Sequence, residues 1–204
     1  MSLFRLRTAL VLTGITTAFI KATNLSGRCS FDYALLETDE ANVPLLLQEV
    51  QANLLLVTNF FRDQLDRYGE LDHTIQLIKQ AAAGRSLELL LNADDPLQSD
   101  IAACTGCQSR YYGFEDTIYD ELTSADSREG RYCVQCGQAL LYERYHYAQL
   151  GQYHCPQCGN RNPCRDYTGQ QLEMDPGIRL QVNDLPLQSS YQGFYNAYNI
   201  LAAV

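Results

Sequence analysis

The sequence predicts an α/β fold: a mostly parallel sheet flanked by helices, with an inserted four-cysteine zinc ribbon. Short apolar runs alternate with longer amphipathic stretches from Asp32 onward, as in strands joined by crossover helices. Two Cys-x-x-Cys pairs then interrupt this pattern within a short polar segment. A strand-like run and an apolar helical run follow the second pair, so the pattern resumes after the insertion.

Three apolar runs have the length of a strand, at residues 33–37, 53–58 and 87–92. The last two are continuous apolar stretches, which is typical of strands covered on both faces. Ligands of open α/β sheets bind at the carboxyl ends of strands, and we therefore expect the polar residues that end these runs to converge. They are Glu37 with Asp39, Thr58 with Asn59, and Asn92 with Asp94 and Asp95.

A helix is predicted between the second and third runs, over residues 72–83. Its apolar side chains recur at near-helical spacing. Asp72 is placed to cap its N-terminus and Gly84 to end it.

The C-terminal part of the chain predicts a hairpin and a helix. Residues 177–182 alternate like a half-buried strand, and Asn183 with Asp184 supplies the turn into a return strand. Residues 195–204 read as the opening turns of an apolar helix. That helix has no C-terminal cap, and we therefore expect the chain to be a fragment.

The two Cys-x-x-Cys pairs predict a zinc site. Gly137 and Gly159 follow the pairs directly, so each pair sits on a tight turn that aims both sulfurs at one point. Two disulfides are the alternative, and they need an oxidising compartment. Four protein ligands leave no open position for substrate, so the metal is expected to be structural. The predicted ligands are Cys133, Cys136, Cys155 and Cys158, in a ribbon over 128–167 inserted between the domain segments 1–127 and 168–204.

Composition excludes some functions. The formal charge is −9 and only two lysines are present, which disfavours a nucleic-acid-binding ribbon. Residues 9–20 are apolar but too short to span a bilayer. They read as a buried helix or the start of a signal peptide. The zinc interpretation implies a reducing compartment, so we expect a cytoplasmic protein.

Polar residues after the predicted strands are candidates for nucleotide and metal binding. Carboxylates at residues 37–40 suit Mg²⁺, although a solvated acidic turn opening a helix is the alternative. The run 58–72 is suited to orient a nucleotide and its metal, or forms an ion-paired surface turn. In the run 92–96 a carboxamide could pair with adenine, or the run forms an Asx turn. No G-x-x-x-x-G-K-[ST] phosphate loop occurs in the sequence.

A third cysteine pair, Cys104 and Cys107, has two interpretations. It could bind a second metal with Cys29 and Cys164, or these residues are reduced, partly buried thiols. A redox or metal-sensing protein that uses this pair is the remotest of the functions considered.

Together, the motifs at residues 35–41, 58–72, 92–96 and 193–203 and the ribbon closely resemble the Mur ligase family. Within it they are similar to the ligase subunits that amidate lipid II. The resemblance covers nearly the whole chain in the family's order. Its most specific part is the run Asn-x-x-x-Asp-Gln-Leu-Asp-Arg-Tyr-Gly-Glu combined with a ribbon. It implies a Mur ligase-like central, ATP-binding domain.

The resemblance implies an ATP-dependent amidation of the D-glutamate α-carboxylate of lipid II to D-isoglutamine. ATP would phosphorylate the carboxylate, and ammonia from a glutamine amidotransferase subunit would displace the phosphate. By matching motif, Glu37 would ligate Mg²⁺, Asn92 would contact adenine, and Gln64 replaces a metal-binding histidine of broader Mur ligases. The residues implied for ATP and Mg²⁺ are Glu37, Asn59, Asp63, Asn92, Asp95, Asn196 and Asn199.

The chain departs from the family pattern in lacking the family's phosphate loop and C-terminal domain. We therefore expect it to be truncated at both ends and unable to turn over ATP alone. ATP hydrolysis by the purified chain that disappears in an Asn92→Ala variant would contradict this expectation. The alternative function is a catalytically inactive zinc-ribbon interaction module or remnant.

Overall fold

The computed structural model describes residues 3–6, 12–24, 26–28, 31–60, 70–123 and 129–204. The chain divides into two compact units. The first comprises Met1–Ala52 with Arg67–Ala83, and the second comprises Asn53–Asp66 with Gly84–Val204. The predicted ribbon and the predicted strands at 53–58 and 87–92 therefore fall in the second unit. The predicted domain boundaries at 127 and 168 stay a prediction.

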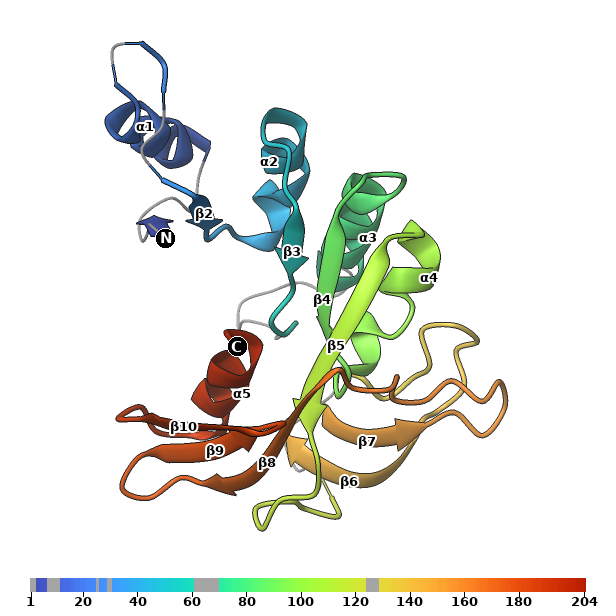
Figure 1. Cartoon of the computed structure of the whole chain (residues 1–204). Coiled ribbons are helices and arrows are strands. Elements are labelled where there is room, and N and C mark those ends of the chain that lie inside the picture. Colours follow the sequence, from blue (N-terminus) through green and yellow to red (C-terminus); the bar gives the residue numbers. More distant parts are fainter. Residues whose placement is uncertain (1–2, 7–11, 25, 29–30, 61–69, 124–128) are drawn as a thin grey trace. The chain divides into compact units, whose positions relative to one another are not determined.

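The first unit combines a small sheet with helices (Figure 1). Its buried core brings Ile15 together with Leu46, and Phe19, Leu36 and Val50 pack against them. Its elements are β1 (Leu3–Leu6), α1 (Leu12–Ala22), β2 (Tyr33–Leu36), the 3-10 helix η1 (Glu40–Asn42), α2 (Val43–Glu49) and α3 (Glu70–Ala82).

The strand predicted at 33–37 has a different partner from the one expected. β2 pairs in parallel with β1 in a two-stranded sheet, not with the strands at 53–58 and 87–92. Tyr33 and Leu35 of β2 are 56% and 50% exposed, so this strand is not covered on both faces. A short apolar run predicts a strand but does not specify its neighbour.

The helix predicted over residues 72–83 is present as α3. Its described part already includes Glu70, so Asp72 lies within the helix and the predicted N-cap role is wrong. The predicted end is confirmed: Gly84 adopts the left-handed conformation, with φ of +70°.

The second unit is built on a six-stranded sheet with the order β10-β9-β8-β5-β4-β3. The strands β3, β4, β5 and β8 run parallel to one another, whereas β9 pairs antiparallel with both of its neighbours, β8 and β10. The sheet is therefore mostly parallel, as predicted. Its strands are β3 (Leu54–Leu56), β4 (Glu88–Asn92), β5 (Gln108–Phe114), β8 (Tyr167–Glu173), β9 (Ile178–Val182) and β10 (Leu185–Ser189).

Helices cover this sheet. Between β4 and β5 lie η2 (Pro96–Gln98) and α4 (Ile101–Thr105), and α5 (Phe194–Ala202) contacts β5, β8 and β9 (Figure 1). Phe114 of β5 and Tyr198 of α5 form an edge-to-face pair with ring centroids 4.9 Å apart. The predicted C-terminal hairpin is confirmed as β9–β10, with Asn183 at φ +50° in its turn.

The ribbon lies between two neighbouring strands of the sheet. After β5 the chain forms the antiparallel hairpin of β6 (Leu141–Tyr147) and β7 (Leu150–His154), and it returns to the sheet as β8. β8 then pairs with β5, with Tyr112 opposite Tyr167. The insertion is therefore anchored at both ends in the sheet.

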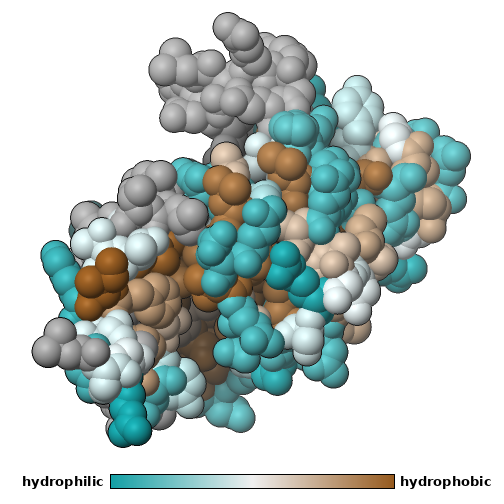
Figure 2. Space-filling view, turned by 90° about the horizontal axis from the view of Figure 1, so that it is seen from above, coloured by the Kyte–Doolittle hydropathy of each residue, from teal (hydrophilic) through white to brown (hydrophobic). Residues whose placement is uncertain are grey.

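On the face that Figure 2 displays, hydrophobic residues lie among hydrophilic ones. The most exposed large hydrophobic side chains of the described residues are Ile118 and Leu122. Among the helices of the described chain, none has both the length and the apolar character needed to cross a membrane.

Candidate functional site

The four predicted zinc ligands come together in the ribbon. Their sulfur atoms all lie within 4.8 Å of one another, and two of the separations, Cys133 to Cys158 and Cys136 to Cys155, are 3.6 and 3.5 Å. Four sulfurs around a tetrahedral zinc ion, at about 2.3 Å each, stand roughly 3.8 Å apart. The four thiols therefore fit a zinc ion.

Two similar turns create this arrangement. Gly137 N donates to Cys133 O at 2.8 Å, and Gly159 N donates to Cys155 O at 3.1 Å. Both glycines are left-handed, with φ of +75° and +76°, a conformation that glycine adopts at little cost. The prediction that each cysteine pair sits on a tight turn is confirmed.

A backbone amide also prepares one of the cysteines, Cys155, as a ligand. The backbone N–H of Cys158 hydrogen-bonds the Cys155 thiolate and helps lower the pKa of Cys155 to about 6, so this thiol ionises readily. Cys133 and Cys155 are buried beside Leu140 and Tyr153. Because all four ligands come from the protein, the site is of the closed, structural type.

The third cysteine pair is not gathered into a comparable site. Cys104 lies 3.7 Å from Asp100 Oδ2, and Cys107 lies 3.7 Å from Arg85 O. In the part of the chain that the structure describes, only the four ribbon cysteines form a group of three or more close metal-ligating side chains. Cys164 is exposed, and Cys29 lies outside the described residues.

Polar side chains join the carboxyl ends of β3 and β4. Asn92 Nδ2 donates to Asn59 Oδ1 at 2.7 Å, and Asn92 Oδ1 accepts from the amide of Asp94 at 2.9 Å. Asn92 is only 1% exposed, and its carboxamide forms the Asx turn that the sequence offered as an alternative. Two of the three predicted polar clusters therefore meet.

Asp95, three residues after Asn92, is fully buried. Its carboxylate accepts hydrogen bonds from Leu97 N at 3.1 Å, Phe60 N at 3.3 Å and Gln98 Nε2 at 3.2 Å. Burial raises the pKa of Asp95 to about 6, although these three donors oppose the shift. Asp95 thus connects the end of β3 to the loop after β4.

Asp94 is the residue of this loop that sequence reasoning left without a role. Arg165 Nη2 donates to Asp94 Oδ1 at 2.7 Å. Tyr198 Oη and Phe114 N donate to Asp94 Oδ2 at 3.0 and 2.7 Å. A fully buried carboxylate needs such partners. Asp94 therefore ties the β4 loop to β5, α5 and the segment before β8.

The remaining predicted residues are placed as follows. Glu37 is exposed and lies in the first unit, where Asp39 Oδ1 caps η1 by accepting from Asn42 N at 2.9 Å. Asp63 lies outside the described residues. On α5, Asn196 Nδ2 donates to Gln192 O at 2.8 Å, and Asn199 is half-buried. Whether Glu37 converges with the β3 and β4 ends stays a prediction.

One unused donor remains at this edge of the sheet. Asn59 Nδ2 is buried and has no hydrogen-bond partner among the described residues. A ligand with an acceptor, such as an adenine or a phosphate, would satisfy it. Asp94 and Asp95 are already engaged with protein donors, so the described residues at the ends of β3 and β4 fit an acceptor of the nucleotide better than they fit Mg²⁺.

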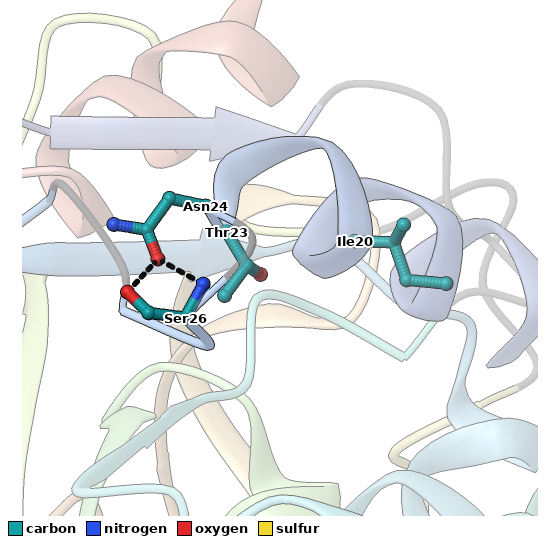
Figure 3. A pocket seen from close by; sticks show the side chains of 4 residues that line it. All are labelled: Ile20, Thr23, Asn24 and Ser26. Carbon is teal, nitrogen blue, oxygen red and sulfur yellow. Dashed lines mark hydrogen bonds between the residues drawn. The ribbon is translucent and has the colours of Figure 1, made fainter.

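The first unit has an open hollow at its surface. Ile20, Thr23, Asn24 and Ser26 line it (Figure 3). Asn24 Oδ1 there accepts from the amide and hydroxyl of Ser26 at 3.0 and 2.7 Å, closing a local turn. No predicted site residue is among these lining residues.

Solved structures of ligases have a fold similar to that of this chain. A pseudomurein peptide ligase type C from Methanothermus fervidus is 26% identical, with a TM-score of 0.67, and the match covers 88% of this chain and 36% of that one. MurF from Acinetobacter baumannii is 13% identical, with a TM-score of 0.59, over 100% of this chain and 35% of its own. At that identity the second likeness concerns the fold alone. The fold is Mur ligase-like α/β.

Curated sequences give a closer likeness. Lipid II isoglutaminyl synthase (glutamine-hydrolyzing) subunit MurT of Staphylococcus aureus strain COL is 37% identical over 190 residues, 93% of this chain and 42% of that protein. MurT of Streptococcus pneumoniae strain ATCC BAA-255 / R6 is 34% identical over 197 residues, 95% of this chain and 43% of that protein. No protein-family model matches the chain. The resemblance predicted from the motifs is confirmed: the chain is a homologue of MurT subunits and spans less than half of their length.

Proposed function

We propose that this chain is the ATP-binding part of a ligase subunit that amidates the D-glutamate α-carboxylate of lipid II. The likeness to MurT subunits over 93% of the chain supports this activity. The structural observation that carries the proposal is the hydrogen bond of 2.7 Å between Asn92 and Asn59. It joins the ends of two neighbouring parallel strands, where α/β sheets bind their ligands.

The described residues would bind and orient the nucleotide. Asn59 presents a buried donor without a partner among the described residues, and Asn92 and Asp95 hold the strand end that carries it. Asn196 and Asn199 lie on α5, which the Tyr198 hydroxyl ties to the same loop through Asp94. Adenine would lie between these two elements.

By the resemblance, Glu37 is proposed to ligate Mg²⁺, which would screen the meeting anions of ATP and carboxylate, and Asp63 is proposed to shape the nucleotide pocket. Zinc is proposed for the four cysteines, in a structural role. A glutamine amidotransferase subunit is the proposed partner, because the names of the relatives describe a glutamine-hydrolyzing enzyme. Cytoplasmic localisation is proposed because cysteines that bind zinc must stay reduced, which a reducing compartment ensures.

A reaction assay tests the proposal. Because this chain spans 42% of the Staphylococcus aureus MurT subunit, the assay uses that subunit with its matching segment replaced by this chain. The purified chimera is incubated with lipid II, ATP, Mg²⁺ and ammonium, and in parallel with glutamine and the amidotransferase subunit. Mass spectrometry of the stem peptide should detect the carboxamide in place of the α-carboxylate. Ammonium separates the ligase activity from the supply of nitrogen, so a missing partner does not obscure the result.

Two asparagine variants control this assay. Asn92→Ala should lower the rate at least about tenfold, since loss of a buried hydrogen bond is worth about 1.4 kcal/mol. Asn53→Ala changes the same residue type at the opposite, exposed end of β3 and should leave the rate unchanged. Phosphate release accompanied by attachment of an amino acid, instead of amidation, would refute the proposed reaction.

A further inference from the structure

The ribbon hairpin reaches the end of β3. Gln149 lies in the turn between β6 and β7, is buried, and donates from Nε2 to Phe60 O at 2.6 Å. Phe60 is also fully buried, and its amide donates to Asp95 Oδ2 at 3.3 Å. The residue after Asn59 is thus held through its carbonyl by the ribbon and through its amide by the β4 loop.

The ribbon also holds the loop after β4. Gly151 N donates to Asp94 O at 2.9 Å. Asn162 Nδ2 lies 3.0 Å from Ala93 O and 2.8 Å from Gly151 O. The two backbone carbonyls that follow Asn92 are therefore bound by ribbon residues.

These contacts are linked to the cysteine cluster. Asn160 Nδ2 lies 3.6 Å from Cys133 Sγ and 3.0 Å from Ser99 Oγ, beyond η2. Tyr153, two residues before Cys155, donates its amide to Asn162 Oδ1 at 2.7 Å. A displacement of either cysteine turn would therefore reach the loop after β4 through an asparagine side chain.

We propose that the zinc ribbon positions the ends of β3 and β4, with Gln149 as the positioning residue for Asn59. The inference deepens the proposed nucleotide site and rests on it. A ribbon that stabilised only its own turns would need no buried side-chain hydrogen bonds to both loops. Zinc binding by the four cysteines would then set the geometry of a site to which the metal itself does not bind.

The test compares Gln149→Met with Gln152→Met in the zinc-loaded chain. Methionine keeps the length of the side chain but cannot donate a hydrogen bond. Gln152 lies on the same hairpin, but its Nε2 donates to Asp116 Oδ1 at 2.7 Å, away from the strand ends. Amide hydrogen exchange is followed at Phe60, and at Cys133 and Cys155 as reporters of ribbon folding. Binding of a fluorescent ATP analogue is measured in parallel.

Gln149→Met should raise exchange at Phe60 about tenfold and weaken nucleotide binding several-fold, while Cys133 and Cys155 stay protected. Removing zinc from the wild-type chain with a chelator should also raise exchange at Phe60, and zinc should restore it. Gln152→Met should change neither the exchange at Phe60 nor the binding of the ATP analogue.

The positioning role is overturned if Gln149→Met leaves hydrogen exchange at Phe60 unchanged. It is also overturned if the variant raises the exchange rates of Phe60, Cys133 and Cys155 equally. Failure of the wild-type chain to bind the ATP analogue, with the Phe60 response intact, would count against the proposed function instead.

Discussion

The hydroxyl of Tyr198 donates a hydrogen bond of 3.0 Å to Asp94 Oδ2, between residues 104 positions apart in the sequence. It ties α5 to the loop after β4, and both groups are fully buried. Asp94 also accepts from Arg165 Nη2 at 2.7 Å, so the carboxylate is neutralised at the point where helix and loop meet. The proposed nucleotide residues on both elements depend on this junction.

Tyr198→Phe tests how much this junction stabilises the fold. The variant keeps the ring packing on Phe114 but leaves a buried carboxylate without one of its donors. We expect the free energy of unfolding to fall by about 1.5–3 kcal/mol, measured by urea denaturation. Tyr191→Phe, at an exposed tyrosine before the same helix, should change it by less than about 0.5 kcal/mol. Equal losses in the two variants would contradict the assigned role.

Asp95 should give the fold a specific pH dependence. Burial raises its pKa to about 6 in the folded chain, from 3.8 in the unfolded chain. The folded state therefore binds the proton more tightly, so this contribution to stability is complete below pH 3.8 and is lost as the pH rises through 6.

The Asp95→Asn variant isolates this effect. Between pH 5 and 7, the wild-type chain should lose about 1 kcal/mol of unfolding free energy relative to the variant, measured by denaturation at each pH. The difference between the two proteins cancels the titration of other groups. A difference that is constant over this range would show that Asp95 keeps an ordinary pKa.

The cysteine cluster predicts the metal content. The purified chain should contain one zinc ion, held by the group of four close thiols. Cys133→Ser should abolish binding and unfold the ribbon, because structural zinc contributes to folding directly. Cys104→Ser is the matched control, and elemental analysis should find its zinc content unchanged. Loss of zinc from the control would reveal a second metal site.

Features encoded by neighbouring residues could be predicted from the sequence. The cysteine turns depend on two Cys-x-x-Cys spacings and on Gly137 and Gly159, and the hairpin of β9 and β10 depends on Asn183. In each case the residues that determine the geometry lie within a few positions of one another. The order of the motifs further indicated the Mur ligase-like fold.

Features that depend on distant partners could not be predicted. Arg165 is 71 positions from Asp94, and no local pattern marks the pair. The hydrogen bond from Gln149 to Phe60 joins residues 89 positions apart, and no local pattern marks it either. The pairing of β2 with β1 was missed for the same reason, since a four-residue strand has many possible neighbours.

The most direct test of the central claim is to map ATP binding on the isotope-labelled chain by amide chemical shifts, with Mg²⁺ present. The account predicts that the largest changes fall at Asn59, Phe60 and residues 92–98, and that Asn59→Ala removes them while Asn53→Ala does not. Changes confined to the ribbon or the first unit, or the same changes in Asn59→Ala, would contradict a nucleotide site at the ends of β3 and β4.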